Sequence, residues 1–319
     1  MFNIHDEIRA NQRRSLFIII MFFLFIGLLG AMAGIVLGVY ANGNLFDVQS
    51  IIFTTVLALI ISLVYIAIFM SSGANMILKA TGATEADRKT YPFLYHTTEA
   101  LSLAAGMKKP PKCYVIDDTA LNAYATGFKA EDSYIVVTTG LMEKLNREEL
   151  EGVLAHEMSH IKNQDIKVML LAAGLVGATI LLADLLFRIF LFAPRGGGGG
   201  EGENKNGVFI IVVLVFWLVL VITAPLVGEM IRLAISRQRE YLADASGAKL
   251  TRYPEGLASA LEKIKNDPDP LVDRANKSTA HLFISTPFRQ KKGPSLMQKL
   301  FATHPPIDDR IARLRGKKN

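Results

Sequence analysis

Two long hydrophobic runs most constrain what this chain can fold into. Leu16–Val39 and Ile51–Met70 contain no charged residue, and each reaches the roughly 20 residues that a helix needs to cross a bilayer. Arg13 and Arg14 precede the first run, as basic residues precede a signal peptide, but the run exceeds the apolar core of about 7–15 residues found in such peptides. We therefore expect two membrane-spanning helices, the first of them an uncleaved anchor.

Two further apolar segments lie in the second half of the chain. Val168–Ala193 and Val208–Val227 are joined by a linker with five consecutive glycines. The first carries Asp184 and Arg188, which can neutralise each other four positions apart on a helix, line a polar pathway, or make the segment shallow or re-entrant. A chain that is 51% hydrophobic, with a mean hydropathy of +0.31, fits several spans plus a modest folded domain.

Basic residues predict the orientation of these spans. The loop Tyr40–Ser50 contains no Lys or Arg, whereas basic residues flank the hairpin on both sides, and such residues favour the cytoplasmic face. The long polar stretches 71–167 and 229–319 should therefore both be cytoplasmic, and the glycine-rich linker external. Much of the net charge of +6 lies in positions that flank the membrane, so we expect a lipid bilayer and no nucleic acid as partner.

The first polar stretch contains a metal-binding pattern, His156-Glu157-Met158-Ser159-His160. On a helix the two histidines, four positions apart, share one face and can hold one metal ion while Glu157 stands beside an open coordination position. Asn146 and Glu149 can form a capping box at the start of this helix. The pattern predicts a hydrolytic zinc site; the alternative is an amphipathic helix with two polar histidines.

A catalytic zinc ion typically has three protein ligands. Outside the glycine-rich linker, no glutamate occurs between Glu157 and Glu229, so Glu229 and Glu240 are the first candidates that return to the cytoplasmic side. Glu229 lies close to the predicted membrane end, whereas Glu240 is followed one helical turn later by Asp244, which could orient a ligating histidine. The alternative for the second stretch is a solvated helical face of paired charges.

A small α/β arrangement precedes the motif. Lys89–Gly106 is predicted as a helix, and Cys113–Ile116, Ala120–Thr126 and Tyr134–Thr138 as short strands. The middle strand alternates small and polar residues over Asn122, Ala123, Tyr124, Ala125 and Thr126. An extended peptide could approach its backbone closely, or it could simply be an edge strand. The single cysteine excludes an intrachain disulfide and is expected to be buried in the first strand, in a reduced compartment.

Taken together, these features resemble the HtpX-type family of membrane-embedded zinc metalloproteases, itself related to the CAAX prenyl endopeptidases. The resemblance covers essentially the whole chain. It implies a multi-pass α-helical membrane protein with a cytoplasmic α+β zincin-like (gluzincin) protease domain, in the inner membrane of a bacterium. It rests on the two hydrophobic pairs, Asn122–Gly127, the His156–His160 motif, Glu240–Asp244 and Thr303-His304-Pro305-Pro306.

The resemblance also implies roles for individual residues. One zinc ion per chain would be held by His156, His160 and Glu240, with Glu157 as general base. His304 is a candidate second donor to the developing oxyanion, because related proteases place a histidine from such a His-Pro element at the site; alternatively it caps the proline turn. The chain would divide into 1–70 with the first hairpin, 71–167 with the motif helix, 168–228 with the second hairpin, and 229–319 with the third ligand and a basic tail.

The expected activity is proteolytic quality control of membrane proteins. Because the motif helix ends near Asp165 and the next apolar segment begins near Val168, the zinc site should lie about 10–15 Å from the membrane surface. Unfolded polypeptides and cytosolic tails of membrane proteins are then the expected substrates, with other quality-control proteins as partners.

Three alternatives come from other readings of the same residues. A CAAX-type endopeptidase would enclose a prenylated tail, for which four spans are few. A multispan protein with a structural zinc would need a fourth ligand, and a scaffold without activity would not need Glu157.

Overall fold

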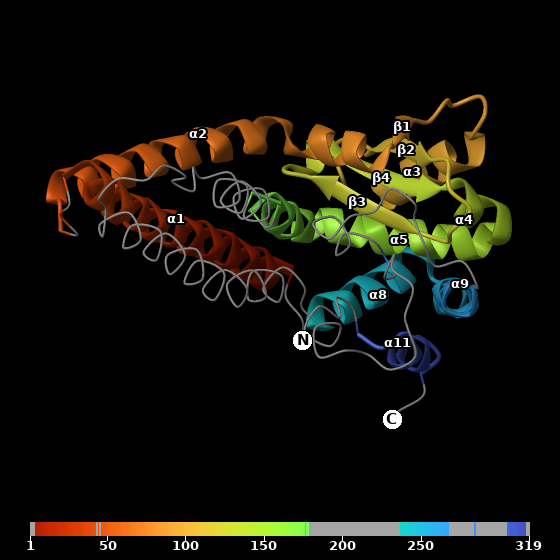
Figure 1. The fold of residues 1–319 in the computed structure, drawn as a ribbon. Helices are drawn as coiled ribbons and strands as arrows, with labels where there is room; N and C mark the ends of the chain where they lie inside the picture. Colours follow the sequence, from red (N-terminus) through yellow and green to blue (C-terminus); the bar gives the residue numbers. More distant parts are fainter. Residues whose placement is uncertain are drawn as a thin grey trace. The chain divides into compact units, whose positions relative to one another are not determined.

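The computed structural model describes residues 4–42, 44, 46–175, 177–178, 237–267, 284 and 305–316 (Figure 1). The chain forms two compact units, one of Met1–Ser15, Ser72–Ala173 and Ile231–Asn319, the other of Leu16–Ser71 and Gly174–Met230. Most of the third apolar segment and all of the fourth lie outside the described residues. Glu229 and His304 lie outside them as well.

Two long helices contain the first pair of apolar runs. Helix α1 is Ile4–Asn42 and helix α2 is Val48–Thr81, and both have a stretch long and apolar enough to cross a membrane. They pack closely where α1 has glycine: a Cβ added to Gly34 would lie 2.4 Å from the Cα of Ile51. At Gly30 the hydroxyl of Thr54 donates to the carbonyl at 2.7 Å. A larger side chain at either glycine would push the helices apart.

A four-stranded sheet lies in the other unit. Its strands β1 (Thr84–Glu85), β2 (Lys112–Ile116), β3 (Ala123–Gly127) and β4 (Ser133–Thr138) run in the order β1-β2-β4-β3. Strands β2 and β4 are parallel, whereas the β1–β2 and β3–β4 pairs are antiparallel. The three predicted strands are confirmed, and β3 is an edge strand. Strand β1 was not predicted, because two residues are too few to show an alternating pattern.

The middle strand begins later than predicted, at Ala123 rather than Ala120. The hydroxyl of Thr138 explains the difference, since it donates to the carbonyl of Ala120 at 2.6 Å and accepts from the backbone N–H of Asn122 at 3.1 Å. A side chain thus replaces part of the regular backbone pairing just before β3.

The helices of this unit surround one central helix, α5 (Figure 1). Helix α5 lies against the sheet on one side, and α8 and α9 pack on its other side. A Cβ added to Gly152 of α5 would lie 2.6 Å from the backbone nitrogen of Leu257, so glycine permits the close approach of α9. The described helical elements are α3 (Pro92–Ala104), η1 (Ala130–Asp132), α4 (Thr139–Lys144), α5 (Arg147–Lys162), α8 (Arg237–Thr251), α9 (Pro254–Asn266) and α11 (Ile307–Leu314).

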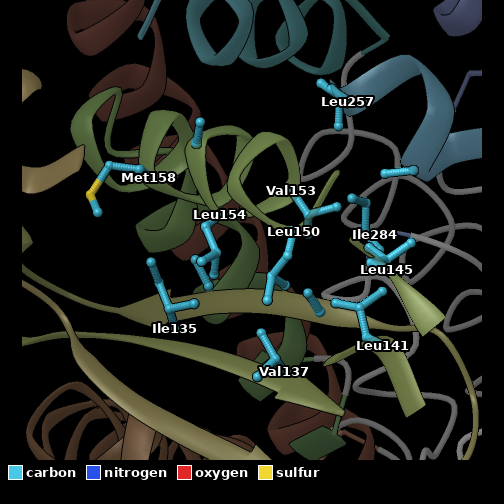
Figure 2. Close-up of a cluster of buried hydrophobic side chains, with 14 of the residues drawn as sticks. Ile135, Val137, Leu141, Leu145, Leu150, Val153, Leu154, Met158, Leu257 and Ile284 are labelled. Atoms are coloured by element: carbon cyan, nitrogen blue, oxygen red, sulfur yellow. The ribbon is translucent and has the colours of Figure 1, made fainter. Parts of the chain in front are cut away.

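Apolar side chains from β4, α5 and α9 form the core (Figure 2). Leu150, Val153 and Leu154 of α5 have helical spacing and point into it, and Ile135 and Val137 of β4 meet them from the sheet. Every residue of α5 from 152 to 161 is buried, including its polar ones. Polar side chains buried in this way need partners, and those partners form the site described next.

Candidate functional site

The start of α5 is held by the predicted capping box, which the structure confirms. The side chain of Asn146 accepts from the backbone N–H of Glu149 at 2.9 Å, and the carboxylate of Glu149 accepts from the backbone N–H of Asn146 at 2.8 Å. Lys263 of α9 adds an ion pair to Glu149 at 2.7 Å. These bonds fix Asn146 as the residue at which the helix begins. They therefore help to set the direction in which His156 and His160 project from α5.

Three buried side chains converge at one point. The Nε2 atoms of His156 and His160 are 3.2 Å apart. Glu240 of α8 brings Oε1 to 3.5 Å from His160 Nε2 and Oε2 to 3.8 Å from His156 Nε2. For a tetrahedral ion with bonds of about 2.0–2.1 Å, neighbouring ligand atoms lie about 3.3–3.4 Å apart. The spacing and chemistry of these donors therefore fit a zinc ion.

A carboxylate holds the far side of each histidine ring. Asp244 Oδ1 lies 3.0 Å from Nδ1 of His156, and Asp165 Oδ2 lies 3.0 Å from Nδ1 of His160. With Nδ1 occupied, each ring directs Nε2 toward the common point. The sequence predicted Asp244 in this position but not Asp165. A turn at Gln164, which has a positive φ of 59°, returns the chain to the site just after α5 ends.

Two buried arginines complete the polar cluster. Arg310 of α11 donates from Nε to Asp244 Oδ2 at 2.9 Å and from Nη2 to Asp244 Oδ1 at 2.7 Å. Arg239 of α8 places Nη1 3.9 Å from Asp165 Oδ1. The sequence predicted neither role, because Arg310 lies in a basic tail interpreted as membrane-flanking and Arg239 in a run of paired charges. The useful signal was that Arg310 shares the buried face of a short helix with Ile311.

The charges in this cluster favour a divalent cation. Four buried acidic side chains, Glu157, Asp165, Glu240 and Asp244, lie in the cluster with two buried arginines, so acidic groups outnumber arginines by two. Burial by itself would raise the pKa of Asp244, but the charge of Arg310 and a hydrogen bond with His156 hold this pKa at about 2. A zinc ion carries the charge that would neutralise the cluster.

The pKa of His160 is shifted by the same acidic side chains. Burial disfavours its charged form, yet the hydrogen bond that His160 donates to Asp165 and the charge of Glu240 outweigh burial and raise the pKa of His160 to about 9.

A glycine positions the helix that carries the third donor. Gly247 of α8 packs against the backbone of α5, and a Cβ there would lie 3.0 Å from the backbone nitrogen of His156. This approach brings Glu240, two helical turns earlier on α8, to the histidine pair.

The five residues predicted to bind substrate are all buried at the edge of the sheet. The backbone N–H of Thr138 donates to the carbonyl of Asn122 at 3.0 Å, so Asn122, Tyr124 and Thr126 direct their backbone groups toward β4. Ala123 and Ala125 direct theirs away from β4. The side chain of Tyr124 is fixed behind the strand by a 2.7 Å hydrogen bond with the hydroxyl of Thr81.

The outward groups of Ala123 already have partners. Its N–H donates to the side-chain oxygen of Asn122 at 3.1 Å, and its carbonyl accepts from the backbone N–H of Ile284 at 2.9 Å. Among the described residues, none pairs with the outward N–H and C=O of Ala125, a residue that is itself buried.

Comparison with known proteins supports a peptidase. The model of Peptidase family M48 matches residues 89–318. A "Protease HtpX homolog" of Dictyoglomus turgidum is 40% identical over 98% of this chain and 95% of its own length. Another, of Streptococcus thermophilus, is 38% identical over 97% of this chain and 98% of its own length. The crystal structure of S. mikatae Ste24p is 22% identical, with a TM-score of 0.46, and the match covers 80% of this chain and 57% of that protein.

The family match includes every residue of the buried cluster, from His156 to Arg310. Relatives called proteases match this chain over nearly its whole length. The resemblance inferred from the motifs is thereby confirmed, and so is the expected zinc chemistry. The chain belongs to peptidase family M48, whose members are zinc metalloproteases.

Proposed function

We propose that this protein is a membrane-embedded endopeptidase that cleaves cytoplasmic regions of misfolded or damaged membrane proteins. The observation that carries this proposal is the convergence of His156, His160 and Glu240 around one point, with Glu157 buried beside them. Family membership supports the peptidase activity, and two helices of sufficient length and apolarity support the membrane location.

His156, His160 and Glu240 would hold the zinc ion. When bound, zinc lowers the pKa of a water ligand toward about 7 and polarises a peptide carbonyl. Glu157 would take a proton from the attacking water and pass it to the leaving amine. Asp244 and Asp165 would keep the Nδ1 atoms of the histidines protonated, which leaves each Nε2 lone pair for the metal.

We propose a supporting role for His304, which lies outside the described residues. It directly precedes Pro305 and Pro306, and Pro306 is the N-cap of α11, the helix that carries Arg310 into the site. A histidine at this position could donate a hydrogen bond to the oxyanion that develops on the substrate carbonyl.

The proposed topology has both termini in the cytoplasm of a bacterium. Residues 1–70 contain the first hairpin and 168–228 the second, while 71–167 and 229–319 together form the catalytic domain. Helices α5 and α8, from either side of the second hairpin, meet in one compact unit, which supports a single catalytic domain. The absence of Lys and Arg between α1 and α2 supports an external loop.

We further propose that substrate binds as an extra strand at the edge of β3. Backbone hydrogen bonds supply affinity without reading much sequence, so cleavage should be broad among unfolded segments. The outward groups of Ala125, with which none of the described residues pairs, would supply the binding site, while those of Ala123 are bonded within the chain.

The test is cleavage of a model membrane protein with an unfolded cytosolic tail by the purified, detergent-solubilised chain, with zinc content measured on the same sample. We expect cleavage within the tail by the parental chain, and zinc without cleavage in Glu157→Gln. A zinc-loaded parental chain that leaves the tail intact would contradict the proposal. So would cleavage restricted to a prenylated C-terminal peptide added as a second substrate, which would indicate a CAAX-type activity.

A further inference from the structure

Arg310 is fully buried, with 0% exposure, and is among the largest of the fully buried side chains that the structure describes. It lies on α11, the last described helix. Its hydrogen-bond and ion-pair partners among the described residues are Asp244, His156 and Glu240, all in the polar cluster around the proposed zinc site. Burying an arginine is costly unless its charge is paired and its N–H groups are hydrogen-bonded. The position of this side chain therefore needs an explanation in the chemistry of the cluster.

The guanidinium group contacts two of the three proposed ligands and the carboxylate that orients one of them. Its Nε and Nη2 atoms donate one hydrogen bond to each carboxylate oxygen of Asp244. Oδ1 of the same carboxylate lies 3.0 Å from Nδ1 of His156. Its Nη2 also lies 3.3–3.4 Å from both ring nitrogens of His156. Its Nη1 lies 3.5 Å from Oε2 of Glu240. A planar, bidentate fork fixes the carboxylate in a way that a single ammonium group cannot.

The other described ion pairs of α11 and its C-cap, at Asp308 and Arg315, lie on side chains that are at least partly exposed. Arg315 forms ion pairs with Glu255 and Glu262 of α9 at 2.6 and 2.9 Å, all on partly exposed side chains. The helix has only eight residues, and a helix this short is not stable without tertiary contacts. Exposed ion pairs contribute little, so the inner face of α11 holds the helix in place. Ile307, Ile311 and Leu314 pack against the apolar core, and Arg310 enters the polar cluster.

We propose that Arg310 is a positioning residue for the metal centre and that docking of α11 and binding of zinc favour each other. This inference rests on the zinc ligands assigned under the proposed function. Without Arg310, Asp244 loses two hydrogen bonds and can turn away from His156, and the carboxylate excess of the cluster grows by one charge. By linkage, whatever α11 docking adds to zinc affinity, zinc binding must add to α11 docking.

The first experiment compares zinc affinity in full-length, detergent-solubilised variants by competition with a chromophoric chelator. Losing a residue that orients a metal ligand costs about 10–100-fold in metal affinity, and we expect a loss in that range for Arg310→Met. Arg310→Lys should recover part of it, because the charge returns without the fork. The matched control is Arg315→Met, at the C-cap of the same helix, whose side chain bonds to Glu255 and Glu262 of α9 among the described residues; this variant should stay within about threefold of the parental affinity.

The second experiment uses the unmodified chain, so it does not depend on a variant folding. Hydrogen exchange of the amides in α11 is measured with and without zinc. We expect zinc to slow exchange in α11 as well as in α5.

Two results would overturn the inference. One is Arg310→Met binding zinc within about threefold of the parental chain, or more tightly, since the lost cation would then have opposed the metal. The other is zinc protecting α5 while leaving α11 unchanged. Either result leaves the proposed function standing if the parental chain binds zinc and cleaves. A parental chain that binds no zinc would instead contradict the proposed function itself.

Discussion

Proline at Ala125 tests whether substrate pairs with the edge of β3. The structure gives Ala125 one outward N–H and one outward C=O, and proline removes only the N–H. The added ring carbons replace that hydrogen and point away from β4. Tyr124 already has the extended backbone that a residue before proline requires, so β3 should form normally.

The expected loss follows from one missing hydrogen bond. A net contribution of about 0.5–1.5 kcal/mol corresponds to a fall of roughly 2- to 13-fold in kcat/KM for an unfolded polypeptide substrate. If the bond is equally strong in the bound substrate and in the transition state, the fall should appear in KM. Ala123→Pro should have a smaller effect, because the N–H at that position is bonded to Asn122 within the chain.

A matched control lies on the opposite edge of the sheet. The backbone N–H of Ala86 donates to Cys113, so the neighbouring Glu85 of β1 directs its own N–H away from β2. Glu85→Pro therefore removes an outward donor far from the proposed substrate and should cleave at the parental rate. The assay measures kcat/KM and zinc content on the same samples. An Ala125→Pro chain that holds zinc and cleaves with parental kcat/KM would refute strand addition, and an equal loss in Glu85→Pro would assign the effect to weakening of the sheet.

Three further predictions concern the metal centre and the core. Glu157→Gln should retain zinc and lose about 10²–10⁴-fold in kcat, whereas Glu240→Ala should lose zinc and activity together; elemental analysis of both samples checks the distinction. Gly247→Ala replaces a helical glycine, a change that normally stabilises a helix by about 1 kcal/mol. Here the added Cβ would crowd the backbone of α5, so the zinc affinity measured by chelator competition should fall. An unchanged affinity would show that α8 can shift without disturbing the site. Burial raises the pKa of the Cys113 thiol, so Cys113 should not react with a thiol reagent until the chain is unfolded. A cysteine introduced by Lys317→Cys would then be the reactive thiol of the folded chain, and its labelling shows on which side of the membrane the C-terminus lies. Labelling of Lys317→Cys from outside intact cells would overturn the proposed orientation.

The parts of the site that could be predicted from the sequence depend on local geometry. His156 and His160 share a helical face whatever surrounds them, and Asn146 and Glu149 lie within one helical turn of each other. Elimination left Glu229 and Glu240 as candidates, the neighbouring Asp244 favoured Glu240, and the family resemblance implied it as the third ligand. The histidine pair and the capping box needed only chain spacing and residue chemistry.

The parts that could not be predicted depend on tertiary contacts. Asp165 reaches His160 only because a turn with positive φ at Gln164 returns the chain, and no spacing rule marks that turn. Arg310 lies 70 residues from Glu240 along the chain, and its charge alone suggested solvent or membrane. In β3, the distinction between Ala123 and Ala125 depends on the pairing register with β4 and on the contact with Ile284.

The distribution of the cluster along the chain has a consequence for when the centre can form. Two of the proposed ligands lie on α5 and the third on α8, beyond the second hydrophobic pair, while the arginine that holds Asp244 lies on α11 near the end of the chain. Helix α5 alone offers two imidazoles without the carboxylate that completes a three-ligand site. A zinc centre of full affinity therefore requires α8 to pack at Gly247 and α11 to dock through Arg310. Peptidase activity should thus be acquired at the last step of folding, when the C-terminal helix binds.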